Sequence, residues 1–151
     1  MSRVLEIGVG FRRQADTDVS IDKSAYCKPD IVRDVAKRGI PFADNTFDKV
    51  YCFEVIEHID SYDDFIFLLN EIWRVLTPDG IWHFSTPNGV GNSFNHLTHS
   101  RAFTRDSFQI LTKDLGYDWE SMRISDGIIA RYALDWIDNA SSIIGLFKAI
   151  K

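Results

Sequence analysis

Short apolar runs at the start of the chain give way to a strong helical pattern near its middle. The runs predict four β-strands, at residues 4–7, 19–22, 30–34 and 47–53. Apolar residues then recur at three- and four-residue spacing over 62–76, which predicts an amphipathic helix. Ser61 and Asp64 can form a capping box at its start, and the turn-forming sequence 77–80 ends it.

The pattern beyond this helix is weaker but still alternates between the two kinds of element. It predicts a fifth strand, a second helix and two closing strands, at residues 81–85, 105–115, 119–124 and 143–150. Thr104 is placed to cap the second helix and Gly116 to end it, with Phe103 and Phe108 as a hydrophobic staple. The segment 127–139 fits either a helix or an apolar lid.

This alternation predicts an α/β fold, a Rossmann-like open sheet that is mostly parallel and has an antiparallel closing strand. Only nine residues, 9–17, join the first two strands, whereas a helical crossover takes roughly ten to twelve. The segment 23–29 is likewise too short for a full second helix. We therefore expect condensed first and second crossovers and a thinly covered sheet face, open to a second copy of the chain or to a partner protein.

Length and composition are those of an ordinary soluble protein. The 151 residues predict a single domain, 1–151, and no apolar run is long enough for a membrane span. Cys27 and Cys52 lie in dissimilar contexts and are expected to be free thiols, which favours the cytoplasm. The net charge of −5 makes a nucleic acid a weaker expectation than a small-molecule substrate, although Arg12 and Arg13 can form a local basic patch.

A glycine-containing turn and a following carboxylate carry the first functional signal. Gly8 and Gly10 follow the first predicted strand, and Asp22 ends the second. Glycines let backbone N–H groups approach a ligand, and a carboxylate at a strand end can accept hydrogen bonds from ribose hydroxyls. The pattern predicts a site for a nucleoside cofactor. Phe11 and the shortened loop leave no third glycine and no helix N-terminus for a pyrophosphate, which weakens a nicotinamide-dependent oxidoreductase as the alternative.

Six segments, taken in order, resemble class I S-adenosylmethionine-dependent methyltransferases. They read LEIGVG, ID, GIPFADNTFD, FEVIEH, EIWRVLTPDG and STPN, at residues 5–10, 21–22, 39–48, 53–58, 71–80 and 85–88. The resemblance is closest to short members that lack the leading helix and condense the first crossover. It implies S-adenosylmethionine as the cofactor, bound by Glu6, Gly8, Gly10, Asp22, Asp34, Val35 and Phe53. By the same resemblance, Asp34 would face the adenine amino group, Val35 would pack on the ring, and Arg12 or Arg13 would reach the methionine carboxylate.

The groups that can assist methyl transfer cluster after two neighbouring strands. A sulfonium methyl is already activated, so the enzyme must align the nucleophile and, for an oxygen acceptor, help to remove its proton. Glu54, Glu57 and His58 follow the fourth predicted strand and His99 follows the fifth, so they can converge at one edge of the sheet. Glu54, His58 and His99 are therefore the candidate catalytic residues. His83, inside the fifth strand, is expected to be structural.

The same segment supports a more specific hypothesis. Its E-x-x-E-H sequence and later histidine are similar to those of small-RNA 2′-O-methyltransferases and ubiquinone-pathway O-methyltransferases. That resemblance implies a divalent cation bound by Glu54, Glu57, His58 and His99. Two carboxylates with two imidazoles suit Mn²⁺, Fe²⁺ or Zn²⁺ better than Mg²⁺. The alternative is that these residues cap the next helix without a metal, or that His58 is a general base.

The sequence as a whole predicts an S-adenosylmethionine-dependent methyltransferase that acts on an oxygen of a small hydroxylated acceptor or an exposed end. No N-P-P-Y or D-P-P-Y sequence follows the fourth strand, which disfavours methylation of amino groups on DNA bases or glutamine. The alternative function is a catalytically inactive, methyltransferase-like binding or partner subunit, because two shortened crossovers leave the cofactor pocket open.

Overall fold

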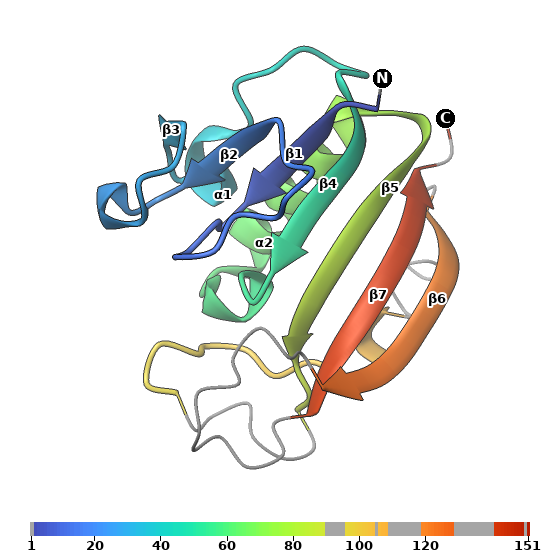
Figure 1. Ribbon diagram of the computed structural model, residues 1–151. Coiled ribbons are helices and arrows are strands. Elements are labelled where there is room, and N and C mark those ends of the chain that lie inside the picture. Colours follow the sequence, from blue (N-terminus) through green and yellow to red (C-terminus); the bar gives the residue numbers. More distant parts are fainter. Residues whose placement is uncertain (1, 90–95, 105, 109–118, 129–140, 150) are drawn as a thin grey trace.

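The computed structural model describes residues 2–89, 96–104, 106–108, 119–128, 141–149 and 151. Figure 1 shows a twisted open sheet with its helices gathered on one side. The strands are β1 (Val4–Ile7), β2 (Val19–Asp22), β3 (Ile31–Val32), β4 (Phe47–Phe53), β5 (Leu76–Pro87), β6 (Trp119–Ile128) and β7 (Ser141–Ala149). Their order across the sheet is β3-β2-β1-β4-β5-β7-β6. Only β7 runs antiparallel to its neighbours, β5 and β6, which confirms the predicted Rossmann-like, mostly parallel sheet.

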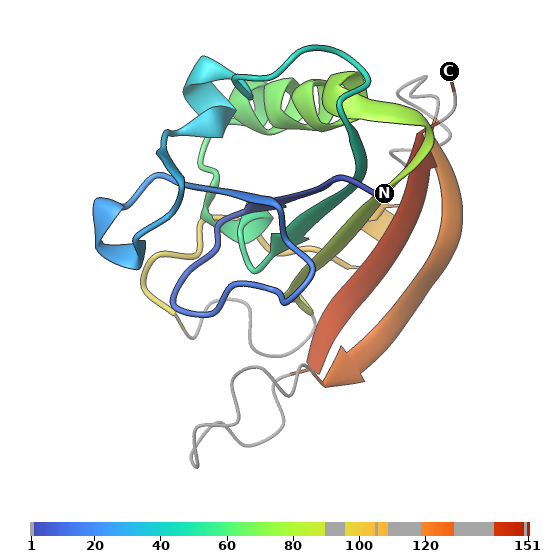
Figure 2. The same cartoon turned by 45° about the horizontal axis from the view of Figure 1, so that its top comes forward.

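The helix α2 (Tyr62–Val75) supplies most of the apolar contact with the sheet. Its inward face, including Leu68 and Ile72, is fully buried against the strands. Each such side chain stabilises the fold by roughly 1.5–3 kcal/mol. The hydroxyl oxygen of Ser61 accepts a hydrogen bond from the N–H of Asp64 at 3.3 Å, so the predicted cap forms. The short helix α1 (Val35–Arg38), which periodicity did not predict, lies beside α2 on the same face of the sheet (Figure 2).

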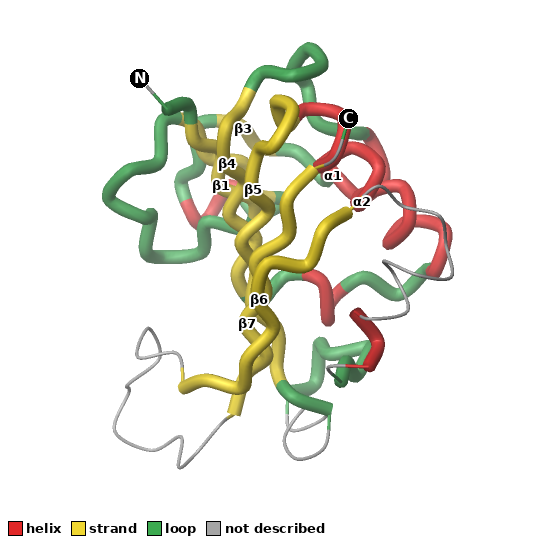
Figure 3. Tube along the Cα trace, turned by 90° about the vertical axis from the view of Figure 1, so that its right-hand side faces the viewer, coloured by secondary structure: helices red, strands yellow, loops and turns green. Residues whose placement is uncertain are grey.

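Both early crossovers are condensed, as predicted. Residues 8–18, which join β1 to β2, form turns and irregular structure without a helix, and the second connection holds only the 3₁₀ turn η1 (Ala25–Cys27). Figure 3 shows the loop after β1 on the face of the sheet opposite to α1 and α2. Among the described residues, no α-helix lies on that face.

Several boundaries differ from the sequence predictions. β3 has two residues rather than the five of 30–34, because Asp30 hydrogen-bonds to Ser20 and Asp34 precedes α1. β5 begins at Leu76, directly after α2, because Leu76 pairs with Phe47; the turn at 77–80 becomes an irregular stretch of the strand.

The C-terminal strands also run longer than predicted at their shared end, with β6 reaching Ile128 and β7 starting at Ser141. Of the predicted helix 105–115, residues 106–108 are helical, and 105 and 109–115 lie outside the described residues. Phe103 and Phe108, the predicted staple, pack with ring centroids 5.3 Å apart. In the segment 127–139, residues 127 and 128 belong to β6 and the rest lies outside the described residues. Within the described part of the chain, no helix is both long and apolar enough to span a membrane.

Candidate active site

A cavity of about 460 Å³ opens at the carboxyl ends of β1, β2 and β4. This volume lies within the roughly 300–1,000 Å³ of small-molecule sites. Six of the seven predicted cofactor residues line it: Gly8, Gly10, Asp22, Asp34, Val35 and Phe53. Glu54 and His58, predicted for catalysis, line it as well. Residues far apart in the sequence therefore meet at one edge of the sheet, as the strand-end argument required.

The glycine turn holds Asp22 in a fixed orientation. Gly8 and Gly10 both have positive φ, +70° and +55°, which a glycine adopts without strain. The N–H of Gly10 donates to Oδ2 of Asp22 at 3.2 Å, and the N–H of Ser24 donates to Oδ1 at 2.8 Å. Each carboxylate oxygen can accept more than one hydrogen bond, so both keep acceptor capacity for a ligand's hydroxyls.

Asp34 and Val35 form the far wall of the cavity. Asp34 occupies the N-cap position of α1, yet its side chain makes no capping hydrogen bond. Its carboxylate is therefore not used by the helix. Val35, the first residue of α1, is buried at 6% exposure and presents an apolar surface to the same space.

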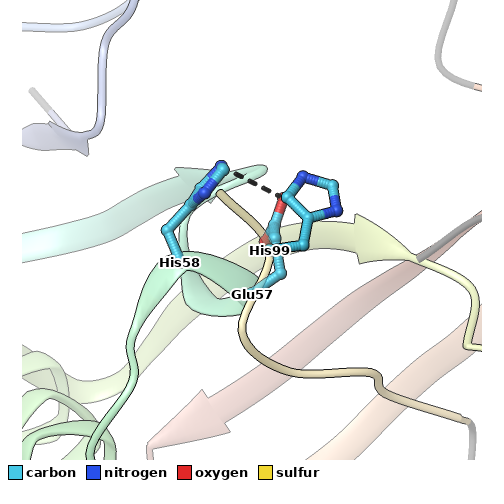
Figure 4. Close-up of side chains that lie close together, drawn as sticks. All are labelled: Glu57, His58 and His99. Carbon is cyan, nitrogen blue, oxygen red and sulfur yellow. Dashed lines mark ion pairs between the residues drawn. The ribbon is translucent and has the colours of Figure 1, made fainter. Parts of the chain in front are cut away.

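Glu57, His58 and His99 form a compact cluster beside this cavity. Their potential ligand atoms all lie within 4.8 Å of one another, and Figure 4 shows the three side chains gathered between two segments. Glu57 and His58 belong to η2 (Ile56–His58), which follows β4. The N–H groups of Ser100 and Arg101 donate to the backbone oxygen of Glu57 at 2.9 and 3.2 Å, and so hold the segment with His99 against η2.

Glu57 is the unusual member of the cluster. It is fully buried, and Oε2 accepts from the hydroxyl of Thr86 at 3.1 Å. Among the described residues Oε1 makes no hydrogen bond of ordinary length, and Nε2 of His58 lies 3.9 Å from it. Burial, together with the nearby charge of Glu54, raises the pKa of Glu57 to about 8. Two carboxyl groups so placed cannot both carry a charge at neutral pH without a compensating proton or cation.

The surroundings of His58 favour a neutral imidazole. Burial lowers its pKa, and His99, Lys23 and His96 act in the same direction against the hydrogen bond to Thr98. Nδ1 lies 3.0 Å from both the backbone oxygen and the hydroxyl oxygen of Thr98. The backbone oxygen can only accept, so the tautomer with hydrogen on Nδ1 satisfies that contact. Nε2 is then left with its lone pair, 3.9 Å from Oε1 of Glu57.

Comparison with known families identifies the chain. A family model described as "Methyltransferase domain" matches residues 5–84, more than half of the sequence. The chain belongs to the class I S-adenosylmethionine-dependent methyltransferases. S-adenosylmethionine is accordingly its methyl donor. A search of the curated proteins found no match.

Solved methyltransferase structures share the whole fold. The N-methyltransferase NodS from Bradyrhizobium japonicum WM9 aligns over 99% of this chain and 86% of its own, with TM-score 0.68 and 14% identity. An S-adenosylmethionine-dependent methyltransferase from Archaeoglobus fulgidus covers 97% and 86%, with TM-score 0.69 and 14% identity. A chain in the complex between the Haloferax volcanii Trm112 methyltransferase activator and its methyltransferase partner aligns over 99% of this chain and 82% of its own, with TM-score 0.65 and 13% identity. At these identities the likeness shows the fold alone.

The methyltransferase structure revises the expected role of Glu6. This residue lies outside the cavity lining and is 1% exposed. Its Oε2 accepts from the N–H of Gln14 at 2.8 Å and from the hydroxyl of Thr17 at 2.9 Å. Successive side chains of a strand point to opposite faces, so with Ile7 in the core, Glu6 must face the loop. Glu6 therefore anchors the first crossover rather than lining the cavity.

The two arginines of the first crossover also stay outside the cavity lining of the methyltransferase. Arg13 pairs with Asp30 at 2.7 Å and donates to the backbone oxygens of Thr17 and Asp18. His83, expected to be structural, lies away from the cavity and packs its ring against Phe53.

Sequence reasoning missed several cavity residues, among them Lys23, Arg33, Lys37, Asp60, Ser61 and Asp64. Lys23 directly follows β2 and Arg33 directly follows β3. Residues at the carboxyl ends of parallel strands line the ligand site, so this rule would have found both if it had been applied to the residue after each strand. Asp60 and Ser61 reach the cavity through the route of the chain into α2, which no local pattern reveals.

Proposed function

We propose that this methyltransferase transfers the methyl group to a hydroxyl oxygen of a small acceptor or of an exposed end. The observation that carries the proposal is the position of His58 at the cavity, where its lowered pKa and the contact of Nδ1 with Thr98 favour a neutral ring with a lone pair on Nε2. An oxygen nucleophile must lose a proton during transfer, whereas a neutral amine attacks with a lone pair it already has. A base in this position therefore favours an oxygen acceptor.

The cavity residues suit the cofactor. Asp22 has acceptor capacity for both ribose hydroxyls, Asp34 has an unused carboxylate for the adenine amino group, and Val35 offers an apolar surface for the ring. A Cβ at Gly10 would meet no atom within 4 Å, so the turn faces open space that a ligand can fill. We assign Phe53 and Glu54 to the sulfonium end, since both stand where β4 opens into the cavity.

The proposed transfer needs one proton acceptor. Bound in the cavity, S-adenosylmethionine would supply an activated sulfonium methyl, which the acceptor oxygen would take in line with the S–CH₃ bond while the electron pair of that bond stayed on sulfur. The hydroxyl proton passes to Nε2 of His58, while Nδ1 remains bonded to Thr98. His99 and Glu57 position the imidazole, with His58 and His99 ring centroids 4.8 Å apart.

A divalent cation is the second candidate for the same cluster. The unpartnered, buried Oε1 of Glu57 is an observation that a cation would explain, and His58 and His99 supply the other two ligand atoms. Glu54 adds a nearby carboxylate whose charge already acts on Glu57. Bound there, a cation would polarise the acceptor hydroxyl and lower its pKa. Nε2 of His58 would then be a ligand and not the base.

Titration with Mn²⁺ separates the two forms of the proposal. Calorimetry on the protein saturated with S-adenosylhomocysteine should show Mn²⁺ binding if the cluster is a metal site, and Glu57→Gln should abolish it. His83→Asn, outside the cavity, is the matched control. If no Mn²⁺ binds and transfer survives EDTA, His58 acts as the base alone.

The acceptor class is tested by transfer of a labelled methyl group to panels of hydroxylated and amino compounds. We expect labelled ethers, and a loss of transfer in His58→Asn. Transfer to amines alone would overturn the oxygen-acceptor proposal. If the folded protein binds neither S-adenosylmethionine nor S-adenosylhomocysteine, the alternative of an inactive binding or partner subunit replaces it.

A further inference from the structure

Two exposed aromatic rings pack against each other on the segments that follow β1 and β2. Phe11 and Tyr26 are each 79% exposed, yet their ring centroids lie 5.7 Å apart at an interplanar angle of 89°. They come from the two condensed crossovers, Phe11 from the loop after β1 and Tyr26 from η1, which lie near each other in Figure 2. Gly10 and Lys23, close to them in sequence, line the cavity. A ligand lying on these rings can therefore reach into the cavity.

Unpaired positive charge surrounds this aromatic pair. Arg12, Lys23 and Lys28 are exposed, and none forms an ion pair with any residue that the structure describes. The acids of the same two crossovers are already engaged in hydrogen bonds: Asp16, Asp18, Asp22 and Asp30. The chain as a whole carries a net charge of −5, whereas the segment 8–30 holds four basic and four acidic side chains and is balanced.

The combination defines the chemistry of a ligand. An edge-to-face pair leaves ring faces open on which a further planar ring can stack. The cationic side chains beside the ring pair can bind an anion. A phosphate can accept hydrogen bonds from several of them at once, which a single carboxylate does less well. Lys23 also lies within electrostatic reach of His58, so the anion would sit between the rings and the candidate base.

We propose that Phe11 and Tyr26 form a stacking platform for the base of a nucleotide acceptor, whose phosphate is held by Lys23 with Arg12 and Lys28. The inference rests on the proposed function, since a ribose hydroxyl of that nucleotide would be the oxygen that receives the methyl group. Phe11 and Tyr26 lie outside the cavity lining, whereas Lys23 is part of it.

Calorimetric titration of the protein saturated with S-adenosylhomocysteine tests the platform, because the cofactor's own nucleoside site is then filled. The probes are cytidine 5′-monophosphate, cytidine and inorganic phosphate. We expect the nucleotide to bind at least tenfold more tightly than either fragment. Phe11→Ala and Tyr26→Ala should each weaken nucleotide binding about tenfold, the usual effect of removing one base-stacking ring. Lys23→Gln should reduce the nucleotide's affinity to that of cytidine.

The controls separate failure of the platform from failure of the proposed function. Phe67→Ala removes a ring that is 40% exposed on α2 and should leave nucleotide binding unchanged. Phe11→Ala, Tyr26→Ala and Phe67→Ala, all outside the cavity lining, should keep the melting temperature and the S-adenosylhomocysteine affinity of the original protein. Lys23 lines the cavity, so the S-adenosylhomocysteine affinity of Lys23→Gln is measured first and its nucleotide titration is made at saturation. If the cofactor product binds but the nucleotide does not, or if neither ring variant weakens the nucleotide, the platform is refuted and the methyltransferase site stands. If the cofactor product itself fails to bind, the proposed function fails first.

Discussion

Gly8 is the position at which one added methyl group should do the most damage. Its φ of +70° costs an alanine about 1–2 kcal/mol more than a glycine. A Cβ built there would also lie 2.2 Å from Cγ2 of Val55, so the valine must move at a further cost of about 1–3 kcal/mol. We therefore expect Gly8→Ala to lower the free energy of unfolding by about 2–5 kcal/mol.

Gly10 is the matched control for this substitution. Its φ is +55°, but a Cβ there would have no atom within 4 Å. Gly10→Ala should therefore bear the conformational cost alone, about 1–2 kcal/mol. Urea denaturation followed by circular dichroism measures both variants on the same scale.

The steric part of the Gly8 effect can be isolated with a double-mutant cycle. Val55→Ala removes the clashing methyl groups, so Gly8→Ala should be less harmful in that background by the steric cost, while the cost of the positive φ stays. Val55 also lines the cavity, so its displacement should weaken S-adenosylhomocysteine binding in Gly8→Ala. Equal losses of stability in Gly8→Ala and Gly10→Ala, or no coupling to Val55, would refute the reasoning.

Three further predictions concern the cofactor, the pH dependence of stability and the open sheet face. Asp22→Ala should weaken S-adenosylhomocysteine binding by about 1.5–3 kcal/mol, and an unchanged dissociation constant in calorimetry would count against the pocket. Hydrogen bonds from Arg74 and the N–H of Ile40 lower the pKa of Glu71 below its usual 4.5. The charged Glu71 therefore stabilises the folded protein above pH 4.5, and this effect is lost as the pH falls through the lower pKa that Glu71 has in the folded state. The difference in free energy of unfolding between the original protein and Glu71→Gln should shrink in acid. A difference that does not change with pH would contradict this. We propose that a second copy covers the face opposite α2, so light scattering should give a dimer that Leu146→Glu dissociates, and a monomeric original protein would exclude it.

The local pattern of apolar and polar residues was sufficient to predict the elements that have one buried face and one exposed face. The bounds of β1, β2 and β4 follow from their apolar runs, and α2 follows from its periodicity and from Ser61. α1 could not be found this way, since four residues are too few to show a period. The start of β5 at Leu76 depends on pairing with Phe47, a contact far along the chain that no local window contains.

The candidate site was predictable to the extent that it lies at strand ends. Gly8, Asp22 and His58 line the cavity because parallel strands bring their carboxyl ends to one edge. Glu6 lies outside the cavity lining because the alternation of the strand turns its side chain to the first crossover, which the family resemblance alone does not indicate. The unpartnered Oε1 of Glu57 depends on three-dimensional burial, which no spacing of residues reports.

The short first crossover explains how this methyltransferase keeps a defined pocket without its first helix. A helix there would be held by apolar packing, whereas this loop is held by polar bonds to the sheet. Glu6 binds Gln14 and Thr17, and Tyr51 donates to Asp16 at 3.0 Å. These hydrogen bonds hold the middle and the end of the loop, so its first residues stay close to β1. The N–H of Gly10 can then donate to the carboxylate of Asp22. The next residue, Phe11, is then turned outward toward Tyr26, so the loop that orients Asp22 also exposes the aromatic pair.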